Sequence, residues 1–230
     1  MSLGPAEWAI IGLSLKVALV AVIGSLPFGI LAAYALARGR FWGREVLNLL
    51  VHLPLVLPPV VTGYLLLMLF GATGPLGRFF EASLGLSFAF RWTGAALAAA
   101  IMAFPLLVRA IRLALEAVDP KLEEAANTLG ASRLRVFLTI TLPLMAPGIL
   151  AGIILAFAKA LGEFGATITF VSNIPGQTQT LPTAIYAALQ VPGQEGAALS
   201  LILISVVLAA AALIASEVLA RAMRKRMEGS

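Results

Sequence analysis

The sequence has no cysteine, a single histidine and few charged residues. The absence of cysteine excludes a disulfide framework and any metal site built on thiolates. Charged residues make up only 12% of the 230 residues, against roughly a quarter in soluble domains, while 60% are hydrophobic. The composition therefore predicts an integral membrane protein. His52 is the single histidine and has no second ligand-type residue near it, so we interpret it as a polar anchor and predict no metal site.

Sequence motifs of common enzyme classes are also missing. There is no GxxxxGK[ST] phosphate-binding loop, so we expect no ATP hydrolysis by this chain itself. There is no Ser/His/Asp set, no HExxH and no visible pair of acid/base carboxylates. We therefore predict a protein that is not an enzyme and binds no cofactor of its own. The net charge of +5 does not indicate nucleic acid either, because the basic residues flank apolar runs and leave no basic face.

What the sequence does contain is a series of long apolar segments. Five of them are long enough to cross roughly 30 Å of hydrocarbon, and they cover residues 9–37, 46–70, 93–114, 147–171 and 197–220. We predict an all-α integral membrane protein, a five-span helical bundle forming one domain over residues 1–230. No Lys or Arg precedes the first span, so we expect it to be retained and not cleaved as a signal peptide. Lys16 near its outer end and Pro27 predict a tilted or kinked helix.

The basic residues are distributed unequally between the connections on the two sides of the bundle. One side has only Arg78 and Arg91. The other side has Arg38, Arg40, Arg44, Arg109, Arg112, Lys121, Arg133, Arg135, Arg221, Arg224, Lys225 and Arg226. Because Lys and Arg concentrate in cytoplasmic connections, the N-terminus is predicted to be outside and the C-terminus cytoplasmic. The connection at residues 115–143 is then cytoplasmic.

This cytoplasmic connection is more polar than the spans and predicts a short helix. Asp119 suits the N-cap, Pro120 the first helical position and Gly130 a left-handed C-terminal cap. Ser132 is predicted to cap a second short helix, which ends by Pro143. A helix this short is marginal in isolation and needs a surface to lie on.

An apolar stripe with helical spacing runs along the first of these helices. It is formed by Leu122, Ala125, Ala126 and Leu129. Two interpretations remain open from the residues alone: the stripe inserts into a groove on a partner protein, or the helix packs beneath its own bundle.

The same connection resembles the EAA loop of permease subunits of bacterial ABC importers. That motif is E-A-A, three residues, G, nine residues, I, one residue and L-P, and its positions are filled by Glu124, Ala125, Ala126, Gly130, Ile140, Leu142 and Pro143. The resemblance implies the type I importer permease fold in the inner membrane and a coupling helix that docks on a separate ATPase subunit. Leu122 and Leu129 of the stripe are expected to join this docking surface.

The resemblance also implies the partners of the chain. They are two ATP-binding subunits that hold ATP and Mg²⁺, a periplasmic oxyanion-binding protein and the surrounding bilayer. Five helices are too few to enclose a transport path comfortably, so we predict a homodimer with the path on its two-fold axis.

Two further stretches resemble the molybdate permeases in particular. They are LPLVLPPVVTGYLLL in the second span and AKALGEFGATITFVSNIPG in the fourth. Sulfate and thiosulfate permeases share the EAA loop and a similar GEFGA segment, whereas the TITFVSNIPG continuation favours molybdate, or the closely similar tungstate. A sulfate/thiosulfate permease is the alternative. An ion-coupled secondary carrier is a more remote one, because no internal repeat is visible.

Candidate transport-path residues lie in the second and fourth spans. Pro58 and Pro59 interrupt the second span and free backbone carbonyls, which Thr62 is expected to help satisfy. The interruption either lines the path or only bends the bundle. Lys159 and Glu163 are spaced to form an ion pair within the fourth span. We favour a structural pair over a gate, because a carboxylate repels an oxyanion.

Weaker candidates surround this ion pair. Gly162 and Gly165 permit bending or close helix approach, and Thr167 and Thr169 add hydroxyl groups. Residues 173–180 lie on the outer side; they face a binding protein or form an ordinary polar loop.

Overall fold

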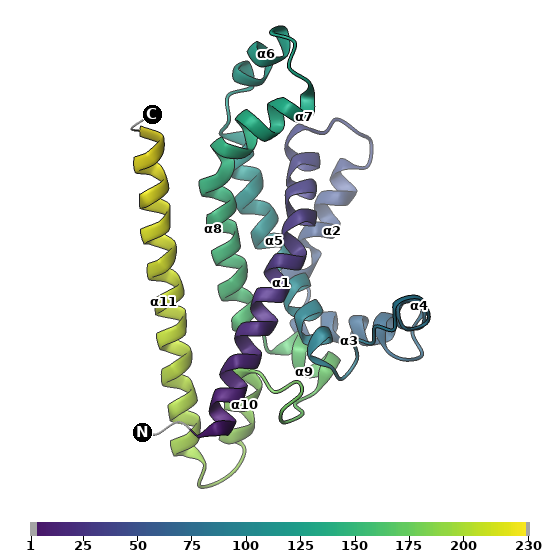
Figure 1. The fold of residues 1–230 in the computed structure, drawn as a ribbon. Helices are drawn as coiled ribbons and strands as arrows, with labels where there is room; N and C mark the ends of the chain where they lie inside the picture. Colours follow the sequence, from purple (N-terminus) through teal and green to yellow (C-terminus); the bar gives the residue numbers. More distant parts are fainter. Residues whose placement is uncertain (1–3, 229–230) are drawn as a thin grey trace.

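The computed structural model describes residues 4–228, with side chains described through residue 215 and at residues 217 and 218. The described chain is helical and contains no strand, which confirms the predicted all-α class (Figure 1). The elements are α1 (Pro5–Arg38), α2 (Arg44–Val56), α3 (Pro59–Phe70), α4 (Pro75–Leu84), α5 (Trp92–Glu116), α6 (Pro120–Thr128), α7 (Arg133–Val136), η1 (Phe137–Thr141), α8 (Leu142–Leu161), α9 (Gly165–Val171), α10 (Leu181–Leu189) and α11 (Glu195–Glu228). The π-helical turn η1 joins α7 to α8, and α1 continues through Pro27.

Within the described residues, four helical segments are long and apolar enough to cross a membrane: Pro5–Arg38, Trp92–Glu116, Arg133–Leu161 and Glu195–Ala215. The pair α2–α3 makes a fifth crossing if it counts as one span, but the chain bends by 116° between the two helices. The second predicted span is therefore broken at Pro58, because two consecutive prolines cannot donate to the helical ladder.

The core of the bundle lies where α5 packs between α1 and α8. Small residues dominate the buried face of α5, including Ala95, Ala98 and Ala99, so neighbouring helices approach closely. Gly152 of α8 lies against α5 at Ala110 in the same way. In membranes, where lipid is as apolar as a leucine side chain, this close packing is a main source of helix association.

The predicted fourth span differs from the observed one at both ends. It was expected over residues 147–171 as one helix, but α8 begins at Leu142 and ends at Leu161, and a separate short helix α9 follows. Gly162 closes α8 with its N–H bonded to the carbonyl of Ala158 at 3.2 Å, and Phe164 leaves the helical conformation.

The two helix breaks pack against each other. A Cβ added to Gly165 at the start of α9 would lie 2.7 Å from the Cβ of Pro59 at the start of α3. One turn further on, a Cβ at Gly63 would lie 2.5 Å from the carbonyl oxygen of Ala166. Glycine at these positions therefore allows α3 and α9 to touch backbone to backbone.

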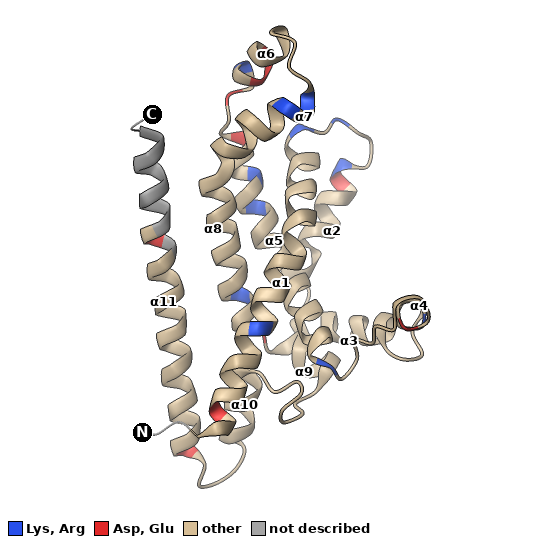
Figure 2. Ribbon diagram, in the orientation of Figure 1, with Lys and Arg blue, Asp and Glu red and all other residues tan. Residues whose placement is uncertain are grey.

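The two ends of the bundle differ in charge. Figure 2 shows most described Lys and Arg residues at the end that carries α6 and α7, while α10 lies at the opposite end. The start of α1 and the last described turn of α11 also lie at opposite ends (Figure 1), as an odd number of crossings requires. The side chains of Arg221, Arg224, Lys225 and Arg226, which entered the predicted orientation, lie outside the described residues.

The contact at Gly63 provides a test of the packing between the breaks. We expect Gly63→Leu to destabilise the solubilised protein by about 1–3 kcal/mol, because the new side chain meets the backbone of α9. Thermal unfolding in detergent measures this effect. Gly12→Leu is the matched control, because a Cβ at Gly12 meets no atom within 4 Å. Equal melting temperatures for both variants would show that α3 and α9 are not tightly packed.

Candidate functional site

Helix α6 stands clear of the bundle at one end of the molecule (Figure 1). None of its residues is buried. The apolar stripe is open to solvent: Leu122 is 47% exposed and Leu129, which follows the helix, is 89% exposed. The interpretation in which this helix packs beneath its own bundle is therefore wrong, and the stripe is available to another protein.

The ends of α6 are fixed by local hydrogen bonds that the sequence predicted. The Asp119 carboxylate accepts from the N–H of Lys121 at 2.9 Å, which confirms the N-cap. Gly130 has φ +84°, which confirms the left-handed cap. Its N–H donates to the Asn127 carbonyl and the N–H of Ala131 donates to the Ala126 carbonyl, the pair of bonds that defines a Schellman cap.

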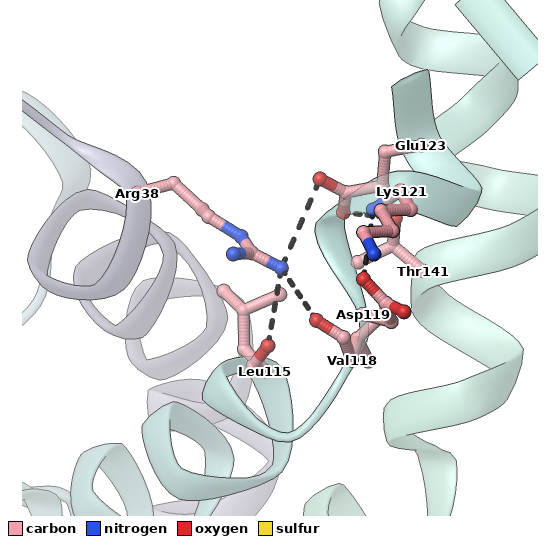
Figure 3. A network of polar contacts seen from close by, with 7 residues as sticks. All are labelled: Arg38, Leu115, Val118, Asp119, Lys121, Glu123 and Thr141. Atoms are coloured by element: carbon pink, nitrogen blue, oxygen red, sulfur yellow. Dashed lines mark hydrogen bonds and ion pairs between the residues drawn. The ribbon is translucent and has the colours of Figure 1, made fainter. Parts of the chain in front are cut away.

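A polar network joins the root of α6 to two other helices (Figure 3). Arg38 ends α1, and its Nη2 donates to the Val118 carbonyl at 3.0 Å and lies 3.8 Å from Oε2 of Glu123. The other carboxylate oxygen of Glu123 accepts from Oγ1 of Thr141, in η1, at 2.8 Å. Glu123 therefore ties α6 to α1 on one side and to the start of α8 on the other.

Sequence reasoning missed this network. From the sequence, Arg38 serves only to assign the two sides of the membrane, and Glu123 has no assigned partner. Arg38 is far in the sequence from Glu123 and Thr141, and no motif links it to either residue. The side chains of Arg38 and Glu123 are only 23% and 21% exposed, so their interaction is less screened than that of a surface pair.

The residues of the EAA pattern fall into two groups in space. Glu124, Ala125 and Gly130 lie on or directly after the projecting helix, and Glu124 and Ala125 are exposed. Ile140 lies in η1, and Leu142 and Pro143 begin α8. The second group thus belongs to the helix that supports the loop.

The second short helix does not end at Pro143, contrary to the prediction. It continues through η1 into α8, where the N–H of Leu142 bonds to the carbonyl of Phe137. Proline is tolerated in the first turn of a helical segment, where its missing N–H costs little, and the π-turn precedes it here.

The break between α8 and α9 holds the intramembrane charges. Nζ of Lys159 lies 2.6 Å from Oε2 of Glu163, and Oε1 of Glu163 accepts from the N–H of Ala166 at 3.0 Å. The Glu163 side chain is only 2% exposed, whereas that of Lys159 is 31% exposed. Glu163 therefore satisfies a backbone donor of α9 as well as the lysine, a geometry that fixes the two short segments relative to each other.

The hydroxyl groups near the breaks have different surroundings. Oγ1 of Thr62 is buried without a hydrogen-bond partner among the described residues. The prediction that Thr62 helps to satisfy the carbonyls freed by Pro58 and Pro59 is therefore wrong. Thr167 is buried in α9. Thr169 donates to the Gly165 carbonyl at 2.9 Å and so bonds within its own helix.

The segment after α9 is an ordered turn. Thr178 is fully buried, and its Oγ1 accepts from the N–H of Ile174 at 2.9 Å and donates to the Ser172 carbonyl. Helix α10 begins at Leu181, and its first N–H donates to Oγ of Ser14 in α1 at 2.7 Å.

His52 lies in α2, where its Nδ1 is 2.9 Å from the carbonyl oxygen of Asn48. Over the described part of the chain, no group of three or more His, Cys, Asp or Glu residues is placed to hold a metal ion.

Comparisons with known proteins agree with this architecture. Residues 25–225 match the family described as "Binding-protein-dependent transport system inner membrane component". The chain is 59% identical to the molybdenum transport system permease protein ModB of Escherichia coli over 98% of its length and 99% of that protein. It is 54% identical to the protein of the same name from Haemophilus influenzae, with 96% of each chain covered.

More distant similarities extend the comparison. The sulfate transport system permease protein CysT of Salmonella typhimurium is 41% identical over 77% of this chain and 64% of its own length. Among solved structures, a chain of a bacterial ABC transporter that imports alginate has a TM-score of 0.74 at 19% identity, covering 95% of this chain and 80% of that one. The fold is therefore shared well beyond recognisable sequence similarity.

The polar network at the root of α6 can be tested by removing its guanidinium. Arg38→Met leaves Glu123 and the Val118 carbonyl without this donor, a loss of about 1–2 kcal/mol. Amide hydrogen exchange within α6 should then accelerate roughly five- to thirtyfold.

Arg112→Met is the matched control for this experiment. Arg112 pairs with Glu116 within α5 at 2.7 Å and donates to Asn48 of α2, so both partners lie outside α6. Exchange in α6 that is as slow in Arg38→Met as in Arg112→Met would show that Arg38 does not hold the helix.

Proposed function

Because the chain belongs to the family of inner membrane components of binding-protein-dependent transport systems, we propose that it is the permease subunit of an ATP-driven molybdate importer. The substrate assignment rests on the 59% identity to a molybdenum transport permease over nearly the full length of both chains. The sulfate relative is less similar and is matched over a smaller part of both chains. As an inner membrane component with several apolar helices, the chain is a multi-pass membrane protein.

In this function α6 is the coupling helix. Its exposed stripe enters a cleft on an ATP-hydrolysing subunit, which binds ATP and Mg²⁺. This chain contributes no phosphate-binding loop and acts as the transport subunit without catalysis of its own. The docking surface comprises Leu122, Glu124, Ala125, Ala126, Leu129 and Gly130, supported from below by Ile140, Leu142 and Pro143. The basic α6 end faces the cytoplasm, and the α10 end faces the binding protein.

Transport requires a second copy of the chain and a path between the copies. When two ATPase subunits close, the two α6 helices move together and the path turns outward, where a loaded binding protein delivers the anion. Glu123 gives this movement two direct routes into the bundle, through Arg38 to α1 and through Thr141 to α8.

The paired helix breaks border the proposed path. A tetrahedral dianion needs hydroxyl groups, backbone N–H groups and irregular backbone rather than hydrocarbon. Pro58, Pro59 and Gly162 are exposed in the single chain, whereas the unpartnered hydroxyl of Thr62 nearby is buried. Gly165 lies against Pro59 beside them, and Thr167 is buried in α9. Glu163 has a structural role, because both of its oxygen atoms already have partners.

Gly130 tests the coupling role. We expect Gly130→Val to reduce transport per ATP hydrolysed, because a β-branched residue at φ +84° is strained by about 1–2 kcal/mol and shifts the end of α6. Uptake and ATP hydrolysis measured in the same vesicles give the ratio. Gly130→Asn is the control, because asparagine tolerates the left-handed conformation. Full coupling in Gly130→Val would contradict the role assigned to this cap.

The substrate is tested by competition. Vesicles containing this chain, its ATPase and its binding protein should take up labelled molybdate in the presence of ATP. Excess unlabelled tungstate should block this uptake and excess sulfate should not. Equal inhibition by sulfate would favour the sulfate-type alternative. If no oxyanion were taken up while the ATPase still bound, the substrate assignment would be wrong and the permease role would remain.

A further inference from the structure

A cavity of about 630 Å³ opens between α1, α2 and α5, and its lining is almost entirely apolar. On α1 the small residues Ala21, Gly24 and Ser25 leave the space open, and Val20 and Phe28 complete this wall. A Cβ at Gly24 would meet no atom within 4 Å. On α5 the lining extends from Trp92 to Phe104, about 18 Å along the helix. We refer to this space as the α1–α2–α5 groove.

The groove lies within the hydrocarbon thickness of a membrane. Lys16 and Arg38 are about 33 Å apart along α1, close to the thickness of a bilayer core, and the groove residues of α1 lie between them. Trp92, at one end of the groove, is of the residue type that concentrates at the membrane–water interface. The groove therefore lies at the depth of acyl chains, and its length is close to the roughly 15 Å hydrocarbon half of one leaflet.

The ammonium group of Lys16 lies at the Trp92 end of the groove. Nζ of Lys16 lies 3.7 Å from the centroid of the Trp92 ring, in cation–π contact, and the lysine is exposed. Ion pairs among the described residues do not include Lys16. The indole face orients the ammonium group without neutralising it, so its charge remains available to an anion at the membrane surface.

We propose that the α1–α2–α5 groove binds a phospholipid, with one acyl chain along the groove and the phosphate at Lys16. A phospholipid satisfies both features at once, because it joins an apolar chain to an anionic group at the depth of Lys16. An apolar helix from a second copy would fill the groove but would cover the ammonium group without a counter-charge, which is costly in a membrane. The bound lipid completes the packing of α2 against α1 and α5.

Fluorescence quenching of Trp92 tests this site directly. In a Trp8→Phe, Trp42→Phe background the chain keeps Trp92 as its one tryptophan. The purified full-length chain in detergent is titrated with phosphatidylglycerol carrying brominated acyl chains. Quenching should saturate. Lys16→Gln should raise the half-saturating concentration about fivefold, as expected for one lost basic contact to an anionic lipid.

Two comparisons separate the groove from general lipid contact. Gly24→Leu fills the groove and should lower the maximal quenching, whereas Gly12→Leu places the same side chain elsewhere on α1, again with no atom near its Cβ. Brominated diacylglycerol, which lacks the phosphate, should bind the parent chain as weakly as the phospholipid binds Lys16→Gln. Quenching without saturation, equal quenching in Gly24→Leu and Gly12→Leu, or an unchanged half-saturating concentration in Lys16→Gln would each overturn the proposal.

Discussion

Backbone N–H and C=O groups in a membrane have no water to bind, so a helix that stops inside an apolar segment must have its ends covered by protein. Two helices stop in this way here, at Pro58 and at Gly162, and the structure covers each break with the other. Gly63 and Gly165 make the close contact possible, and Glu163 supplies a carboxylate to a free N–H of α9 while Lys159 offsets its charge. The rest of the bundle, with α5 packed between α1 and α8, holds these paired breaks in place. The constraint also limits what the breaks can do. A path for an anion can use only those backbone and hydroxyl groups that do not take part in this packing.

At the other end of the molecule, helix α6 is exposed, and little protein covers it. Helix α6 is short, polar on most of its surface and unburied, so its conformation depends on its caps and on its attachment. The caps at Asp119 and Gly130 define where the helix begins and ends. The attachment through Glu123 connects it to α1 and to the start of α8. In the proposed mechanism this arrangement lets a displacement of α6 move two long helices together, which a flexible loop could not do.

The sequence predicts these parts unequally, for physical reasons. Apolar length and the spacing of capping residues are local properties, so the all-α class and the caps of α6 followed from the sequence. The break at Gly162 was not predicted as a helix end, because its stability depends on α3 lying alongside, which no local pattern reveals. The continuation through Pro143 was missed for a similar reason, since a π-turn there has no clear sequence signature. The Arg38 network joins residues distant in the sequence and needed coordinates to be seen.

The central claim is that the exposed stripe of α6 is covered by an ATP-hydrolysing subunit in the assembled transporter. The natural absence of cysteine allows a direct measurement, because a single introduced thiol is then the one reactive thiol in the chain. Leu129→Cys, carrying a photoactivatable cross-linker, should attach to the ATPase subunit in the assembled complex, whereas Phe79→Cys on α4, which is also exposed, should not. Cross-linking at position 129 in a complex that still transports would support the account. A transporting complex in which position 129 stays free, or in which position 79 is the one that reaches the ATPase, would contradict it.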